Sequence, residues 1–92
     1  MKYFTWNHDK NRELIEARKI SFERVVQHIQ THGYLDIIRH PNVLKYPHQK
    51  IFILNIEEYA YLVPFVESET HFFLKTIIPS RKATKKYIKE RL

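Results

Sequence analysis

The stretch Lys50-Ile51-Phe52-Ile53-Leu54-Asn55-Ile56 decides the fold. Apolar side chains fill both alternating sets of positions in it, which is typical of a central strand. Glu57-Glu58 gives a tight connection to a second strand, 59–66, and the polar turn 67–70 leads to a third strand, 71–78. Three successive strands with short polar connections predict an antiparallel meander. Pro64 cannot donate to a ladder, so we expect the second strand at an edge or with a bulge.

The half of the chain before this stretch predicts two helices that can cover the meander. A short strand over 2–6 precedes a helix over 8–18, whose apolar face is narrow. A second helix begins after Ser21, ends at Gly33, and carries one apolar stripe with helical spacing: Phe22, Val25, Val26 and Ile29. A strand over 34–38 and a loop over 39–49 follow. We therefore expect one α+β domain over 1–92: a single antiparallel sheet of three to four strands plus a short N-terminal strand, two N-terminal helices, and a basic C-terminal helix.

The C-terminal segment 76–92 combines a helix start with concentrated positive charge. Pro79 ends the third strand of the meander and Ser80 is a good N-cap residue. Six basic residues stand against one acid from position 81 onwards: Arg81, Lys82, Lys85, Lys86, Lys89 and Arg91. Cations in a first helical turn oppose the helix dipole, so this pattern favours a phosphate-binding surface. A solvated terminal helix is the alternative.

Composition limits the classes of protein and partner. The chain has 92 residues, no cysteine and a formal net charge of +6, and its sequence pI is about 9.7. The charge predicts an anionic partner, either nucleic acid or an acidic protein. The lack of cysteine, of a signal peptide and of a long apolar run favours a cytoplasmic protein without a membrane partner.

Sequence motifs for cofactor, nucleotide or metal chemistry are absent, so we expect no cofactor and no metal. One glycine excludes a phosphate-cradling loop, and the pair His28 and His32 lacks further ligands. A basic site without metal can still cleave RNA, because the 2′-OH attacks the adjacent phosphorus. The residues that could meet on the sheet for this chemistry are His40, His48, Lys50, Lys75 and Arg81. His48 could also be only an exposed loop residue, and Lys75 only a solvated one.

Three blocks of sequence resemble the BrnT family. They are Phe4-x-Trp6-x-x-x-Lys10-Asn11, Ile20-Ser21-Phe22-Glu23 and Ser80-Arg81-Lys82-Ala83-Thr84-Lys85-Lys86. The family consists of small bacterial toxins of type II toxin–antitoxin systems, with a fold similar to RelE-type ribonucleases. The resemblance implies a ribonuclease that inhibits translation and growth. It also implies a cognate antitoxin as partner, mRNA as substrate, and contact with operator DNA only through the antitoxin.

The resemblance also assigns residues and shows departures. Arg81 matches an arginine of the third block, Trp6 and Lys10 match the first block, and Lys50 stands where the family usually has arginine. Ala17-Arg18-Lys19 replaces the family's Lys-His-Gly, so a turn glycine is missing here. Pro79 replaces a small residue.

The sequence therefore predicts a metal-independent endoribonuclease. Lys50, Arg81 and His48 are the predicted catalytic residues. The predicted RNA-binding residues are Trp6, Lys10, Lys75, Lys82, Lys85 and Lys86. Trp6 can instead be a core residue, and the lysines solubilising charge. The alternative function is a non-catalytic basic module that binds nucleic acid or an acidic protein, and a toxin that has lost activity would look the same.

Overall fold

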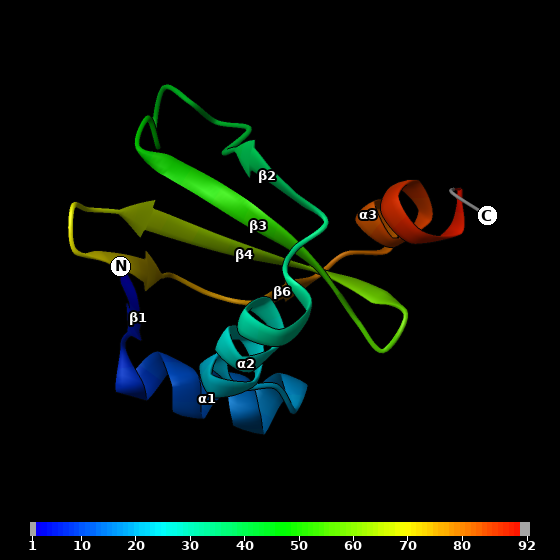
Figure 1. Cartoon of the computed structure of the whole chain (residues 1–92), viewed down its shortest axis with the longest axis horizontal. Helices are drawn as coiled ribbons and strands as arrows, with labels where there is room; N and C mark the ends of the chain where they lie inside the picture. The colour runs from blue at the N-terminus through cyan, green and yellow to red at the C-terminus, as the bar shows by residue number, and fades with distance from the viewer. Residues whose placement is uncertain (1, 91–92) are drawn as a thin grey trace.

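Six strands form one open sheet in the order β1-β5-β4-β3-β2, with β6 pairing with β4 beyond the end of β5 (Figure 1). The computed structural model describes residues 2–90; Arg91, counted above in the basic segment, lies outside them. The elements are β1 (Tyr3–Trp6), α1 (His8–Arg18), α2 (Phe22–His32), β2 (Asp36–Arg39), β3 (Gln49–Ile56), β4 (Tyr59–Glu67), β5 (His71–Leu74), β6 (Ile78–Pro79), α3 (Arg81–Thr84) and the π-helix η1 (Lys85–Lys89). The expected compact α+β domain is confirmed.

The sheet is mixed, whereas the sequence predicted an antiparallel one. β2, β3, β4 and β5 form the expected antiparallel meander, but β1 pairs with β5 in parallel, with Tyr3 opposite His71 and Trp6 opposite Leu74. The meander leaves one edge of β5 unpaired. β1 fills that edge in the direction that places Phe4 and Trp6 in the same core as α2.

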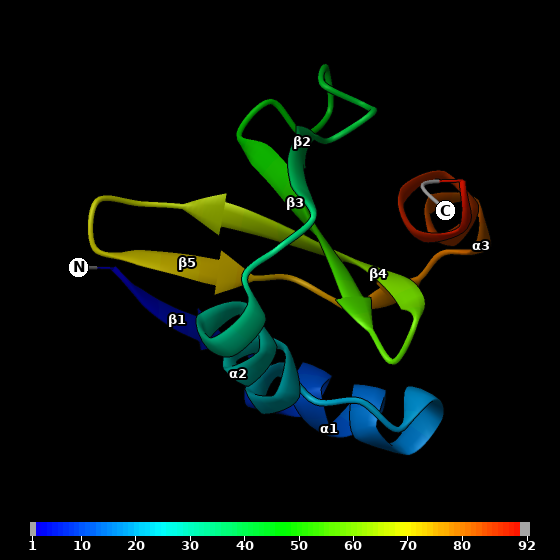
Figure 2. The ribbon, with the colours of Figure 1, turned by 45° about the vertical axis from the view of Figure 1, so that its right-hand side comes forward.

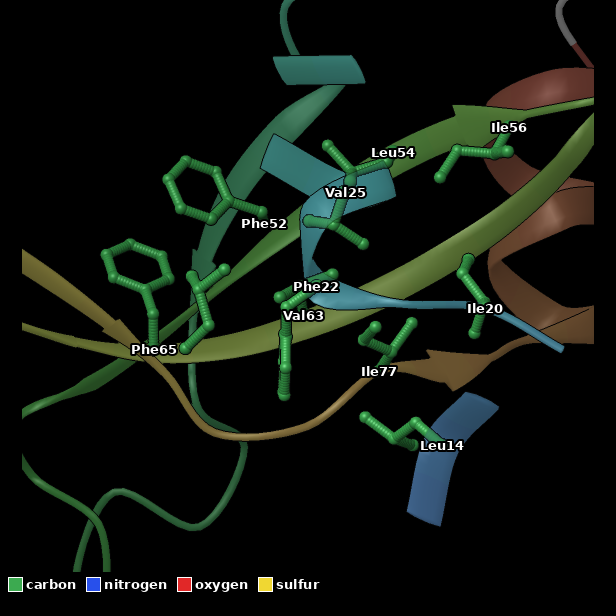
Figure 3. Close-up of a cluster of buried hydrophobic side chains, with 11 residues drawn as sticks. Leu14, Ile20, Phe22, Val25, Phe52, Leu54, Ile56, Val63, Phe65 and Ile77 are labelled. Carbon is green, nitrogen blue, oxygen red and sulfur yellow. The ribbon is translucent and has the colours of Figure 1, made fainter. Parts of the chain in front are cut away.

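The main core lies between the sheet and the pair α1 and α2. The expected stripe of α2 faces the sheet: Phe22 and Val25 are fully buried against Phe52, Leu54 and Val63 (Figure 3). Leu14 of α1 and Ile77, which precedes β6, close the same cluster. Two helices therefore cover one face of the sheet.

The opposite face has a second cover that the sequence analysis did not assign. Ala83 and Ile88 of the C-terminal helix are buried against Ile53 and Ala60 of the sheet. Figure 2 shows this helix on the other side of the strands from α1 and α2. Ala83 and Ile88 are five residues apart, and the N–H of Glu90 donates to the carbonyl of Lys85 at 2.8 Å, as in a π-helix. The basic helix is thus a packing element as well as a charged one.

Pro64 lies in a central strand and not at an edge, which corrects the expectation for residues 59–66. The third strand of the meander, predicted over 71–78, is split into β5 and β6. Pro64 accepts a hydrogen bond from the N–H of Lys75 at 2.8 Å, within the interruption between them. In an antiparallel strand the N and C=O of a residue point to the same side. The missing proline donor therefore points to where the neighbouring strand is interrupted.

A buried amide joins α1 to the start of α2. Asn11 is 7% exposed; its Oδ1 accepts from the N–H of Phe22 at 2.8 Å, and its Nδ2 donates to Glu23 Oε1 at 2.7 Å. Ser21 caps α2, as expected, by accepting from the N–H of Arg24. The amide of Asn11 lowers the pKa of the Glu23 carboxyl below its ordinary value, with further contributions from its own backbone N–H and from His8. One side chain therefore ties α1 to the first turn of α2.

None of the helices within residues 2–90 is long and apolar enough to cross a bilayer.

Asn11→Ala should lower the free energy of unfolding by about 2 kcal/mol, because it leaves the N–H of Phe22 buried without an acceptor. It should also raise the pKa of Glu23. The ionised carboxyl stabilises the fold above the ordinary glutamate pKa, and this contribution is lost as the pH falls through the lowered folded value. The stability difference between wild type and variant should therefore shrink in acid, as measured by urea unfolding at several pH values. Glu13→Ala, an exposed change on the same helix, is the control. Equal losses at neutral and acidic pH would contradict the coupling to Glu23.

Lys19→Gly should raise the free energy of unfolding by about 1 kcal/mol. Lys19 ends α1 in the left-handed region (φ 58°, ψ 32°), with its N–H donating to the carbonyl of Ile15. This is the position at which the BrnT family has glycine, and a side chain there is strained. Thermal or urea unfolding measures the change. Lys19→Ala removes the same charge and keeps the strain, so it should leave stability within about 0.5 kcal/mol of wild type.

Candidate functional site

A hollow of about 500 Å³ opens at the end of the sheet where β2 and β4 finish and β3 begins. It is lined by Lys2, Arg39, Pro47, His48, Gln49, Lys50, Glu67, Ser68 and Glu69. We call it the sheet-end hollow. Three cations, two carboxylates and a histidine therefore share one small depression.

The strands bring these side chains to one face. Lys50 pairs in register with Arg39 on one side and with Phe65 on the other. Because side chains alternate along a strand, Lys50 shares the face of Phe52, and Glu67 shares the face of Phe65. Both phenylalanines belong to the core beneath α1 and α2. The charged side chains therefore continue the helix-bearing face past the point where its apolar core ends.

Glu67 is the central group of the hollow. Its Oε2 accepts from Lys2 Nζ, and its Oε1 lies 4.0 Å from Lys50 Nζ. The hydrogen bond from Lys2 lowers the pKa of the Glu67 carboxyl, and the charges of Lys2 and Lys50 act in the same direction. Glu67 is thus an ionised carboxylate held beside two cations.

The loop before β3 positions His48 in the hollow and keeps His40 in a structural role. The His40 ring lies 4.5 Å from the Tyr46 ring, and its Nδ1 accepts from the N–H of Asn42 at 3.1 Å. The N–H of Tyr46 in turn donates to the carbonyl of Asn42 at 2.9 Å. His48 is exposed and lines the hollow beside Lys50. The structure therefore brings together two of the three predicted catalytic residues, Lys50 and His48.

Arg81 lies elsewhere. Ser80 caps the C-terminal helix as predicted, and its N–H donates to the carbonyl of Ala60 at 2.9 Å. Ala60 and Phe65, the register partner of Lys50, are five residues apart on β4, which at about 3.4 Å per residue corresponds to roughly 17 Å. Arg81 lines a separate hollow of about 500 Å³ with Tyr59, Thr84, Lys85, Lys89 and Glu90. The structure does not place Arg81 in the same site as Lys50.

Three of the predicted RNA-binding lysines are exposed on the same helix as Arg81. These are Lys82, Lys85 and Lys86. Tyr87 fixes this helix to β2 by donating to Asp36 Oδ2 at 2.9 Å, and burial, with the hydrogen bond to Asp36, raises its pKa. The helix therefore presents its cations to solvent from an anchored position. We call this surface, Arg81 with the three lysines, the basic helix surface.

The remaining predicted RNA-binding residues are dispersed. Trp6 stacks on Phe22, with ring centroids 5.7 Å apart, and packs against the main core, as in the core alternative given above. Lys10 lies in the first turn of α1, outside the sheet-end hollow. Lys75 is exposed just after β5, with its Nζ 5.4 Å from the centre of the Phe73 ring.

The described part of the chain holds no group of three or more histidine, cysteine or acidic side chains that could bind a metal. The His28 and His32 rings stack 4.9 Å apart, and burial lowers the pKa of His28, with His32 and Arg24 contributing.

Comparison of the chain with protein-family models, with curated proteins and with solved structures finds no significant match.

The sequence analysis missed Lys2, Arg39 and Glu67 as residues of the sheet-end hollow. Lys2 and Glu67 are 65 positions apart and meet only because β1 pairs with β5 in parallel. Arg39 was placed in the loop 39–49 by the sequence analysis, whereas it ends β2 opposite Lys50.

Lys2→Gln should raise the pKa of Glu67, because it removes the ammonium charge, the nearer of the two, from the donor of the hydrogen bond to Glu67. The side-chain carboxyl chemical shift of Glu67, followed by NMR through an acid titration, measures the change. Lys19→Gln removes a charge outside the hollow and should leave the Glu67 titration unmoved. An unchanged midpoint in Lys2→Gln would show that the pair does not persist in solution.

Proposed function

We propose that this chain is a metal-independent ribonuclease toxin of a bacterial type II toxin–antitoxin system, with a BrnT-like and RelE-like fold. The observation that carries the proposal is the sheet-end hollow, in which Lys2 and Lys50 flank Glu67, and Arg39 and His48 line the same depression. The three-block resemblance and the net charge of +6 support it.

The residues of the hollow match the needs of RNA cleavage by the 2′-OH. The attacking oxygen loses a proton as it bonds to phosphorus, and Glu67, ionised beside Lys2, accepts it. Lys50 and Arg39 stabilise the negative charge that develops on the phosphoryl oxygens. His48 donates a proton to the departing 5′-oxygen. The products are a 2′,3′-cyclic phosphate and a free 5′-hydroxyl.

Arg81 takes a binding role in this proposal and not the catalytic one predicted from the sequence. Its distance along β4 from the register partner of Lys50 keeps it from the reacting phosphate. With the other cations of the basic helix surface it holds phosphates of the RNA chain outside the scissile bond.

The partners of this protein follow from the same proposal. A cognate antitoxin neutralises the toxin in the cytoplasm and alone contacts operator DNA, and mRNA is the substrate. Expression of the chain without its antitoxin then arrests growth, and co-expression of the antitoxin relieves the arrest.

The test is cleavage of single-stranded RNA by the purified full chain in the presence of EDTA. Lys50→Ala and Glu67→Gln should each lower kcat by at least about 100-fold, because each removes charge stabilisation or proton transfer from the reacting phosphate. Arg81→Ala should raise KM and leave kcat near wild type. Cyclic-phosphate ends should form, and a 2′-deoxy nucleotide at the cleaved position should block the reaction.

Lys19→Ala, outside the hollow, is the matched control and should cleave as wild type does. Loss of kcat at saturating RNA in Arg81→Ala would overturn the division of roles between Arg81 and Lys50. Salt-sensitive RNA binding with no turnover by wild type would favour the non-catalytic binding module.

A further inference from the structure

Three aromatic rings gather on the face of the sheet opposite α1 and α2, at the edge formed by β1 and β5. Phe4 and Phe72 point into the main core, so their neighbours in the alternating pattern point the other way. These neighbours are Tyr3 on β1, and His71 and Phe73 on β5. We call these three residues the aromatic platform.

Tyr3 is the open ring of the platform, whereas His71 and Phe73 are half-buried. Tyr3 is 59% exposed and stacks on His71, with centroids 5.3 Å apart and planes 28° apart. The turn before β5 holds the His71 ring, because its Nδ1 lies 3.1 Å from Ser68 Oγ and 2.9 Å from Thr70 Oγ1. Within residues 2–90, β1 is the last strand at this edge of the sheet, and no described strand lies beyond Tyr3. The outer side of the Tyr3 ring can therefore receive another flat ring.

The C-terminal helix does not cover this part of the face. The second core cluster, which that helix completes, draws its sheet residues from β2, β3 and β4, and within residues 2–90 it includes none from β1 or β5. In Figure 2 the helix lies at the opposite side of the sheet from β1 and β5. The platform is thus the exposed remainder of a face that is otherwise packed.

Positive charge accompanies the rings. Lys75 places its Nζ 5.4 Å from the centre of the Phe73 ring. Lys2, directly before Tyr3, lines the sheet-end hollow, as does Ser68, which contacts His71. The platform and the hollow therefore adjoin around the end of β1 and the turn between β4 and β5.

We propose that the aromatic platform binds unpaired bases of single-stranded RNA, with Lys75 contacting a phosphate between them. Exposed rings beside lysines are the surface on which proteins stack successive bases of a single strand, because every base presents a π-face. The choice of RNA rests on the proposed ribonuclease function. The platform then holds nucleotides next to the scissile one and selects single strands over duplexes, whose bases are already stacked on each other.

The experiment measures binding separately from cleavage. The full chain is titrated into a fluorescent 2′-O-methyl oligonucleotide, which cannot be cleaved, and anisotropy is recorded at fixed salt. Tyr3→Leu should weaken binding about tenfold, whereas Tyr3→Phe should bind as wild type does, because a ring and not apolar area is required. Lys75→Ala should reduce the salt dependence of binding by about one phosphate contact. Tyr34→Leu, a similarly exposed tyrosine (53%) outside the platform, is the matched control and should bind normally.

A second comparison tests the stacking itself. An oligonucleotide with abasic positions should bind wild type more weakly, and Tyr3→Leu should show no further loss with it. Equal affinities of wild type and Tyr3→Leu for the intact strand, or equal affinities of wild type for single strand and duplex, would overturn the platform. Tyr3-dependent binding without cleavage of natural RNA would keep the platform and reject the ribonuclease. Cleavage by Tyr3→Leu with an unchanged KM would keep the ribonuclease and reject the platform.

Discussion

The structure depends on one constraint: β3 carries apolar side chains toward both faces of the sheet. Phe52 and Leu54 need cover on one side, and Ile51 and Ile53 need it on the other. Burial of each such side chain is worth about 1.5–3 kcal/mol, so neither face can be left to water in a chain of this size. α1 and α2 cover the first face and the C-terminal helix covers the second. The sheet-end hollow and the aromatic platform lie where these covers do not reach, at the end of the sheet and at its β1 edge.

The residues that carry the family resemblance are mostly the ones that hold this architecture together. Asn11 of the first block bonds the backbone and a side chain of the second block, where Phe22 receives the Trp6 ring. In the third block, Thr84 Oγ1 accepts from the N–H of Ala60 at 2.8 Å and donates to the carbonyl of Ser80 at 2.7 Å. These contacts explain why the three blocks hold an amide, an aromatic ring and a hydroxyl at fixed positions relative to one another. They concern the fold, so the candidate chemistry has to be argued from other residues.

Local signals in the sequence were sufficient for most elements. Ser21 caps α2 where it was expected, Gly33 ends α2 with φ 77°, and the observed bounds of α1 match the predicted 8–18. Each of these depends on neighbours within about four residues. The pairing of strands that are far apart in sequence could not be predicted, because strand propensity does not indicate which strands pair. The parallel β1 and the meeting of Lys2 with Glu67 belong to this class.

The C-terminal helix, which covers the second face of the sheet, shows a different limit of prediction from sequence. Ala83 and Ile88 have the spacing of a π-helix, which a search for an α-helical stripe overlooks, and the dense lysines around them drew the interpretation toward charge alone. The sequence therefore predicted only part of the candidate site. Lys50 and His48 were named correctly as neighbours, because the loop and strand start that hold them are contiguous in sequence. Arg81 was joined to them although the length of β4 separates it from them.

The parallel pairing of β1 with β5 also governs when the two candidate surfaces form during synthesis. Tyr3 can pair only once His71 has been made, and Lys2 can reach its partner only once Glu67 has been made, so the edge pair forms after the strands between them. Contacts between residues so far apart in sequence form late, because the entropic cost of closing the long loop comes before the contacts that offset it. The sheet-end hollow and the aromatic platform share that pair of strands. A nascent chain therefore lacks both surfaces until β5 has been synthesised, and the two candidate surfaces then form together.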